Sequence, residues 1–126
     1  MIFVDTNVFM FAVGRQHPLQ AEARRFFEEA LVHKIRLCTS AEVLQELLHA
    51  YLPVGRTQTL ADALALVTRM GVEVWALERE DVEAAVALQA QFPALDARDL
   101  CHLACCRHRQ VTRIQTFDQA LASVSS

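Results

Sequence analysis

The chain has 126 residues, a formal net charge of −3 at pH 7 and a hydrophobic fraction of 53%. Its length suits one folded domain, residues 1–126, whose core needs no disulfide or structural metal. No apolar run approaches the roughly 18 residues that span a bilayer, and Asp5 interrupts the apolar start, so we expect neither a membrane span nor a signal peptide.

The cysteines indicate the cellular compartment of the protein, and the net charge limits the kind of nucleic-acid binding that it can have. Three of the four cysteines fall between Cys101 and Cys106, without the spacing of a disulfide framework, which indicates reduced thiols and a cytoplasmic protein. The acidic net charge excludes a strongly basic, non-specific nucleic-acid binder. It does not exclude a nucleic-acid substrate, because basic residues would outnumber the remaining acids if four acids bound a metal.

The first predicted element is a short buried strand, Ile2 to Val4, which stops at Asp5. The apolar run continues from Val8 to Val13 and is broken at residues 14–18. A helix then runs from Pro18 to about Lys34, since Pro suits a first helical turn and apolar residues recur at helical spacing. A second strand is expected at 35–39.

A capping box predicts the start of the next helix, with Thr39 as the cap and Glu42 reaching back to its amide. Because Glu42 then has a structural task, Glu46, one turn later on the same face, is the better site candidate. A further helix is expected from Thr57 to Gly71, followed by a strand at 72–77. Acids at 78–81 favour the start of another helix, whose dipole they complement.

The last informative stretches each contain a carboxylate at an element end. Asp96 is placed to cap a helix, and Asp99, three residues later, is left without a capping task. A fourth strand is expected at 111–117, with Asp118 just past its end. Asp118 is either a site residue or the cap of a short helix at 119–122.

The order of these elements predicts an α/β fold with a mostly parallel sheet and helices on both faces. Ligands of such sheets bind at the carboxyl ends of the strands, where Asp5 lies. Grouped carboxylates raise one another's pKa unless a cation compensates, and Mg²⁺ prefers oxygen ligands. Such a site suits phosphodiester hydrolysis by a metal-activated water. The acids selected by this argument are Asp5, Glu46, Asp99 and Asp118.

Four segments resemble, in order, the signatures of PIN-domain nucleases, most closely the VapC-type toxins of prokaryotic toxin–antitoxin pairs. They are Val4 to Val8, Ser40 to Leu47, Ala97 to Ala104 and Thr116 to Asp118. The resemblance covers essentially the whole chain and implies a PIN-like three-layer α/β/α sandwich.

The resemblance also implies roles for individual residues. Mg²⁺ or Mn²⁺ would be held by Asp5, Glu46, Asp99 and Asp118, and three side chains would orient these acids by hydrogen bonds: Thr6, Asn7 and Thr116. Many members carry a further strand after the fourth acid, whereas residues 119–124 follow here, which leaves Asp118 either a ligand or an acid behind the ligands.

The activity implied is that of a metal-dependent endoribonuclease, the toxin of a pair, dimeric and neutralised by a small antitoxin that covers part of the apolar run at 9–13. Arginine forks suit phosphates. The candidates for RNA backbone contact are Arg98, Arg107, Arg109 and Arg113.

Several alternatives stay open. A haloacid-dehalogenase-type phosphatase would need a second aspartate at position 7, which is Asn7, and a receiver module would need a lysine near the end, whereas Lys34 is the only lysine. A zinc site built on Cys101 and its neighbours lacks a second ligand pair. A non-catalytic PIN-like RNA-binding or scaffold domain and a housekeeping PIN nuclease remain. His49 and His102 are either packed side chains or contacts of the site.

Overall fold

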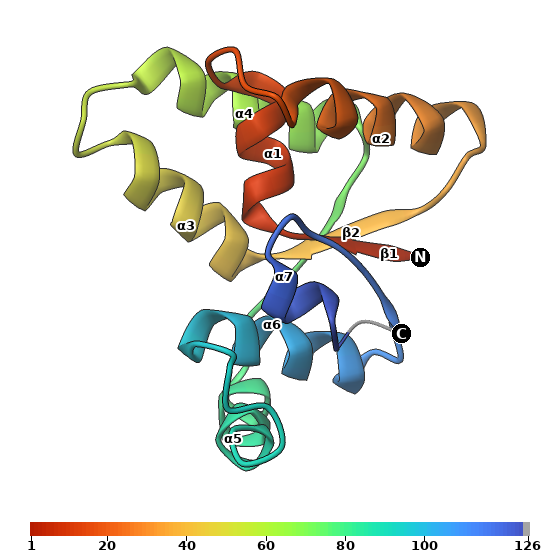
Figure 1. The fold of residues 1–126 in the computed structure, drawn as a ribbon, viewed down its shortest axis with the longest axis vertical. Coiled ribbons are helices and arrows are strands. Elements are labelled where there is room, and N and C mark those ends of the chain that lie inside the picture. Colours follow the sequence, from red (N-terminus) through yellow and green to blue (C-terminus); the bar gives the residue numbers. More distant parts are fainter. Residues whose placement is uncertain (125–126) are drawn as a thin grey trace.

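The computed structural model describes residues 1–124 and contains a four-stranded sheet with helices on both faces (Figure 1). The strands are β1 (Ile2–Val4), β2 (Leu37–Ser40), β3 (Glu73–Trp75) and β4 (Arg113–Gln115). They lie in the order β3-β2-β1-β4, and every pairing is parallel. Ile2 pairs with Leu37 on one side and with Arg113 on the other, so β1 occupies the centre. The predicted parallel α/β sheet is confirmed.

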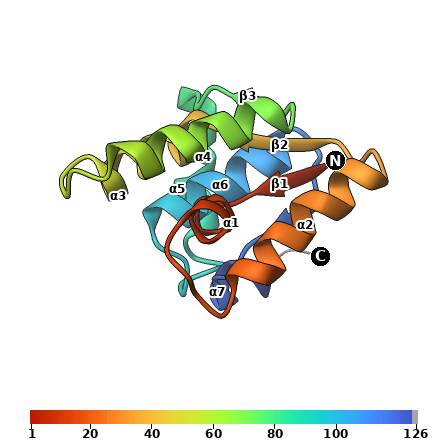
Figure 2. The ribbon, with the colours of Figure 1, turned by 90° about the horizontal axis from the view of Figure 1, so that it is seen from above.

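The helices form two groups around this sheet. In the first group α1 (Thr6–Val13), α2 (Gln20–Val32), α3 (Ala41–Tyr51) and α4 (Thr57–Arg69) cover one face. In the second group α5 (Arg79–Leu88), α6 (Ala97–His108) and α7 (Gln119–Ala122) lie on the other face. Figures 1 and 2 show these layers from two directions. No helix within residues 1–124 is both long and apolar enough to cross a membrane.

Two hydrophobic cores hold the layers together. The larger core contains the strands and α1 to α4, and its centre is formed by the fully buried Phe3 and Phe9. The smaller core lies between α5, α6 and α7, where Leu103 and Leu121 are buried. Ile114 of β4 packs against both cores. The central strand is therefore fixed from both faces, which fixes the residues that follow it.

Helix α1 was not among the predicted elements. Most of its eight residues are apolar. Val8, Phe9 and Ala12 are buried, and the side chains between them pack partly on the core. A helix surrounded by protein has no polar face, so its sequence shows no helical periodicity. The apolar run at 8–13 is thus a short helix that begins directly after Asp5.

The predicted cap of α3 was wrong by one residue. Ser40 is the N-cap, and its hydroxyl accepts a hydrogen bond from the Val43 amide at 3.4 Å. Thr39 lies in β2, fully buried, and its Oγ1 donates to the Val4 carbonyl at 2.8 Å. A buried threonine hydroxyl must find an acceptor, and the neighbouring strand supplies one. Glu42 therefore follows the cap by two residues rather than three.

The acids at 78–81 start α5 as predicted, and Asp81 has a further structural task. Its Oδ2 accepts from the Glu78 amide at 2.9 Å in a capping box, while its Oδ1 lies 3.0 Å from His108 Nδ1. Arg109 Nη1 lies 3.5 Å from the same Oδ1. Asp81 thus joins α5 to the end of α6. Glu78, Asp81 and His108 lie close enough together to hold a metal ion. However, the Arg109 guanidinium already supplies positive charge beside Asp81.

Candidate metal centre

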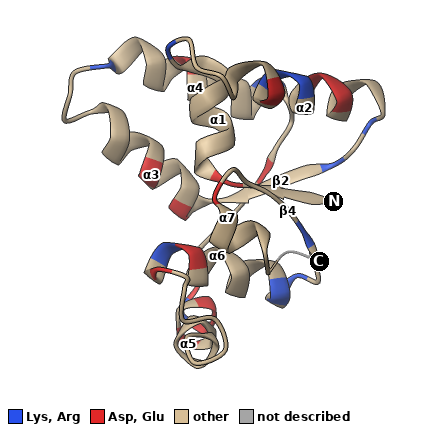
Figure 3. Cartoon of the chain, in the orientation of Figure 1, with Lys and Arg blue, Asp and Glu red and all other residues tan. Residues whose placement is uncertain are grey.

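Five carboxylates line one cavity of about 240 Å³ at the carboxyl end of the sheet: the four predicted site acids, which come from four separate segments, and Asp96, the N-cap of α6. Asp5 follows β1, Glu46 lies in the middle of α3, Asp99 in the first turn of α6, and Asp118 just before α7. Acid-bearing segments gather at this end, whereas several basic segments lie at the opposite end, where β2 and β4 begin (Figure 3). The fold thus brings together all four acids that the sequence selected.

Asp5 is buried and is the most tightly hydrogen-bonded of the four. As the N-cap of α1, its Oδ1 accepts from the Thr6 amide at 2.8 Å. Its Oδ2 accepts from Thr116 Oγ1 at 2.6 Å and from Asn7 Nδ2 at 3.5 Å. Burial raises the pKa of Asp5, although the nearby His102 and these hydrogen bonds oppose the rise. The orientation of this carboxylate is therefore set by groups next to β1 and β4.

Asn7 and Thr116 also tie α1 to the segment after β4. Asn7 Oδ1 accepts from the Phe117 amide at 3.1 Å, and Thr116 Oγ1 accepts from the Asp118 amide at 3.0 Å. The Phe117 ring meets Phe11 edge-on, with centroids 5.4 Å apart. These contacts hold the turn that contains Asp118 against the helix that starts at Asp5.

Glu46 reaches the cavity from α3 and is held by two donors. Thr6 Oγ1 donates to its Oε2, and His102 Nε2 lies 3.1 Å from its Oε1. Burial on its own raises the pKa of Glu46, but these two hydrogen bonds outweigh burial, so the pKa lies below its ordinary value. Glu46 is thus an ionised carboxylate with both oxygens engaged.

Asp99 differs, because its carboxylate accepts no hydrogen bond from the described residues. Its amide donates to Asp96 Oδ1 at 2.9 Å, which confirms Asp96 as the cap of α6. Burial, followed by the charges of Asp96, Asp5 and Asp118, raises the pKa of Asp99 to about 7. Asp99 is the carboxylate whose charge the protein leaves uncompensated.

Asp118 has both of the tasks that the sequence left open. Its Oδ1 accepts from the Leu121 amide at 3.1 Å and caps α7. The residue also lines the cavity with the other three acids. Because a carboxylate offers about four lone-pair positions, the cap leaves acceptor capacity toward the cavity.

The four candidate arginines are divided between two places. Arg98 lines the cavity, and its Nη2 lies 3.9 Å from Asp96 Oδ2. Arg107 lies over the Phe92 ring and Arg109 over the Trp75 ring, both at the far end of α6, and Arg113 begins β4. The structure thus places only Arg98 beside the acids. RNA contact by these side chains stays a prediction.

The sequence left His102 open between a packed side chain and a contact of the site, and the structure places it behind the acids. The side chain is 1% exposed, and its Nε2 faces Glu46 Oε1 at 3.1 Å and Asp5 Oδ1 at 3.7 Å. Burial lowers the pKa of His102, but the hydrogen bond to Glu46 and the charges of Asp5 and Glu46 outweigh burial and raise it. Its position three residues after Asp99 was the available signal, because residues at this spacing share a helix face.

The donor set of the cavity fits a hard divalent cation. The four acids offer carboxylate oxygens, and two of them, Asp5 and Glu46, are fixed by hydrogen bonds. Asp5 Oδ1 and both oxygens of Glu46 each have a single hydrogen-bond partner, which leaves one lone pair free on each of them. Burial, followed by the charges of Asp96, Asp5 and Asp118, raises the pKa of Asp99, so its ionised form is both poorly solvated and repelled by the neighbouring acids. A cation with oxygen preference would remove this repulsion.

Comparisons with known proteins show which family and which proteins the chain is similar to. The family model described as PIN domain matches residues 2–126. Ribonuclease VapC23 of Mycobacterium tuberculosis is 60% identical over 123 residues, which cover 98% of this chain and 97% of the relative.

Two solved structures share the fold. The crystal structure of Mycobacterium tuberculosis VapC20, a toxin described as cleaving the sarcin–ricin loop, matches with a TM-score of 0.80 at 19% identity, covering 98% of this chain and 94% of that chain. A toxin–antitoxin complex from Klebsiella pneumoniae matches with a TM-score of 0.69 at 18% identity, covering 98% and 92%.

The raised pKa of Asp99 makes a testable prediction for the metal-free protein. Between the ordinary pKa of 3.8 and the folded value of about 7, the folded state holds a proton that the unfolded chain has released. The free energy of unfolding therefore falls as pH rises through this window. Asp99→Asn should be more stable than the wild type at pH 8, and the difference should shrink toward pH 5. Urea unfolding in EDTA at several pH values measures this.

The matched control is Asp62→Asn, which removes a carboxylate from α4, outside the acid cavity. Its difference from the wild type should change little with pH. A pH-independent difference for Asp99→Asn would contradict the assignment of an uncompensated carboxylate at this position.

Proposed function

The chain belongs to the PIN-domain family, in the branch of the VapC ribonucleases, and from this we propose that it is a Mg²⁺- or Mn²⁺-dependent endoribonuclease and the toxin of a toxin–antitoxin pair. The observation that carries the proposal is the convergence of Asp5, Glu46, Asp99 and Asp118 on one cavity.

All four cysteines are free, which fits the reducing cytoplasm in which we expect the protein to act. Pairing with a second copy of the chain stays a prediction.

The residues of the cavity divide the work of phosphodiester hydrolysis. Asp5 and Glu46, both held by hydrogen bonds, present oxygens in fixed positions, and Asp99 adds the charge that nothing else compensates. A divalent cation bound to these acids would supply the Lewis acid that activates water and neutralises charge on the phosphate. Arg98, at the edge of the cavity, is placed to hold the RNA backbone. The nucleophile is water rather than a side chain.

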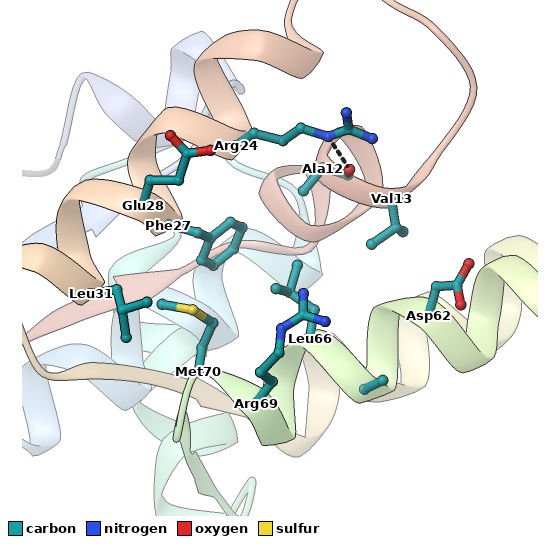
Figure 4. A pocket seen from close by; sticks show the side chains of 11 residues that line it. Ala12, Val13, Arg24, Phe27, Glu28, Leu31, Asp62, Leu66, Arg69 and Met70 are labelled. Carbon is teal, nitrogen blue, oxygen red and sulfur yellow. Dashed lines mark hydrogen bonds between the residues drawn. The ribbon is translucent and has the colours of Figure 1, made fainter.

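The antitoxin is proposed to seat in a second cavity, of about 520 Å³, between α1, α2 and α4. Its floor and walls are apolar, formed in part by Val13, Phe27 and Leu66 (Figure 4). Its rim carries both signs of charge, with Arg24 and Glu28 on α2 and Asp62 and Arg69 on α4 (Figure 4). These features suit an amphipathic helix of a small partner protein, whose apolar stripe is flanked by acidic and basic residues.

Helix α1 connects this groove with the acid cavity. Thr6, Asn7 and Met10 line the acid cavity, while Ala12 and Val13 line the groove. The eight residues of α1 span about 12 Å at ~1.5 Å per residue. About four extended residues of a seated partner would cover this distance and reach the acids. A partner in the groove is thus placed to block the cavity.

The test of the activity is cleavage of total RNA by the purified chain in Mg²⁺ or Mn²⁺. We expect discrete fragments with the wild type and none in EDTA. Asp5→Asn keeps a capping residue at the start of α1 but weakens the site, so the rate should fall by about 100-fold or more. Glu22→Gln, an exposed position on α2, should cleave like the wild type. Binding of RNA without cleavage by folded protein would favour the non-catalytic scaffold alternative.

The groove is tested with two neighbouring residues of α2. Leu31 is 67% exposed and lines the groove, whereas Val32 is 74% exposed and does not. Leu31→Glu should weaken binding of the proposed antitoxin by about 10-fold or more, because a carboxylate would have to be buried on binding. Val32→Glu should bind like the wild type in calorimetry. Equal affinities for both variants would exclude the groove as the antitoxin site.

A further inference from the structure

The ring of His102 lies behind the carboxylates rather than in the cavity. It is held in α6 with 1% of its side chain exposed, and the residues that line the acid cavity do not include it. Its ring packs against the ring of Phe3 in β1, with centroids 5.4 Å apart. The ring is therefore enclosed between the central strand and α6, and one edge faces the acids.

Within residues 1–124, this ring makes polar contacts through Nε2 alone. Nε2 lies 3.1 Å from Glu46 Oε1 and 3.7 Å from Asp5 Oδ1, whereas Nδ1 is buried and has no hydrogen-bond partner among the described residues. Since only a protonated Nε2 donates to a carboxylate, the tautomer is assigned from its partners. A buried imidazole with one unpartnered nitrogen is unfavourable compared with an apolar side chain of similar size. The polar contacts that offset this cost are those of Nε2 with Glu46 and Asp5.

The group that Nε2 controls is the carboxylate of Glu46. A glutamate side chain has three rotatable bonds, and Glu46 reaches the cavity from α3, on the opposite face of the sheet from α6. Two hydrogen bonds fix it, one from Thr6 Oγ1 to Oε2 and one from His102 Nε2 to Oε1. Without the second bond only Thr6 would restrain the carboxylate of Glu46, whereas Asp5 keeps three donors of its own.

We propose that His102 is a positioning residue that holds Glu46 beside Asp5, so that both carboxylates face one cation, and that His102 is not itself a ligand. The proposal rests on the cation site of the proposed function. The competing arrangement is direct ligation, because one atom each of Asp5, Glu46 and His102 lie within 4.8 Å of one another. The lining of the cavity favours the positioning role, since a cation reached from the cavity meets the carboxylates first.

The experiment compares two amides at position 102. The amide nitrogen of Gln reaches the place of Nε2, whereas the shorter Asn does not, so only His102→Gln retains a donor toward Glu46. Mn²⁺ affinity is measured by the EPR signal of free Mn²⁺, with circular dichroism as the check of folding. We expect His102→Gln to bind within a few-fold of the wild type and His102→Asn to bind about 10- to 100-fold more weakly.

A second measurement uses only the wild type and separates positioning from ligation. Pulsed EPR of the Mn²⁺-loaded protein should show no directly coordinated ¹⁴N. A coordinated ¹⁴N would overturn the proposal, as would equal Mn²⁺ affinity in the wild type and His102→Asn. A wild type that binds no Mn²⁺ would overturn the cation site itself, and with it the proposal, which distinguishes that failure from the failure of positioning alone.

Discussion

Electrostatic repulsion among carboxylates is the constraint on which the rest of this structure depends. Asp5, Glu46, Asp99 and Asp118 converge on one cavity although nothing in their own chemistry favours it. The protein offsets part of the repulsion with donors, from Thr6 and Thr116 on the oxygens of Asp5 and from Thr6 and His102 on those of Glu46. Asp99 accepts no hydrogen bond from the described residues, and burial together with the charges of Asp96, Asp5 and Asp118 raises its pKa to about 7. A cation bound among these carboxylates would offset the repulsion that is left.

The fold supplies the rigidity that such a grouping needs. The central strand β1 is paired on both edges and buried on both faces, so Asp5 cannot move away from its neighbours. The larger core fixes α3, and with it Glu46, while the smaller core fixes α6 and α7 below the sheet. Thr39 in β2 adds a hydrogen bond to the Val4 carbonyl just before Asp5. The packing around β1 is therefore what keeps like charges together.

The sequence predicted those parts of the site that depend on local signals. Patterns a few residues long predicted the strand that ends at Asp5. They also predicted that Asp96 caps the helix, so that Asp99 has no capping task. The structure contains both features. Helix α1 was not predicted because residues 8–13 are apolar all round the helix. The prediction of Thr39 as a cap was wrong because its acceptor, the Val4 carbonyl, lies 35 residues away in the chain. The contact of His102 with Glu46 joins positions 56 residues apart, so the spacing of His102 from Asp99 could indicate its helix face but not this partner. Features that depend on neighbouring residues could be predicted from the sequence, whereas contacts between distant segments could be found only in the folded structure.

If these carboxylates form one cation site, anomalous diffraction from crystals soaked in Mn²⁺ will locate the ion. We expect an anomalous peak inside the cavity, about 2 to 2.5 Å from carboxylate oxygens of Asp5 and Asp99. The cation site would be contradicted by an empty cavity at millimolar Mn²⁺. A peak found only at Glu78, Asp81 and His108, the other group of potential ligands in residues 1–124, would contradict it equally.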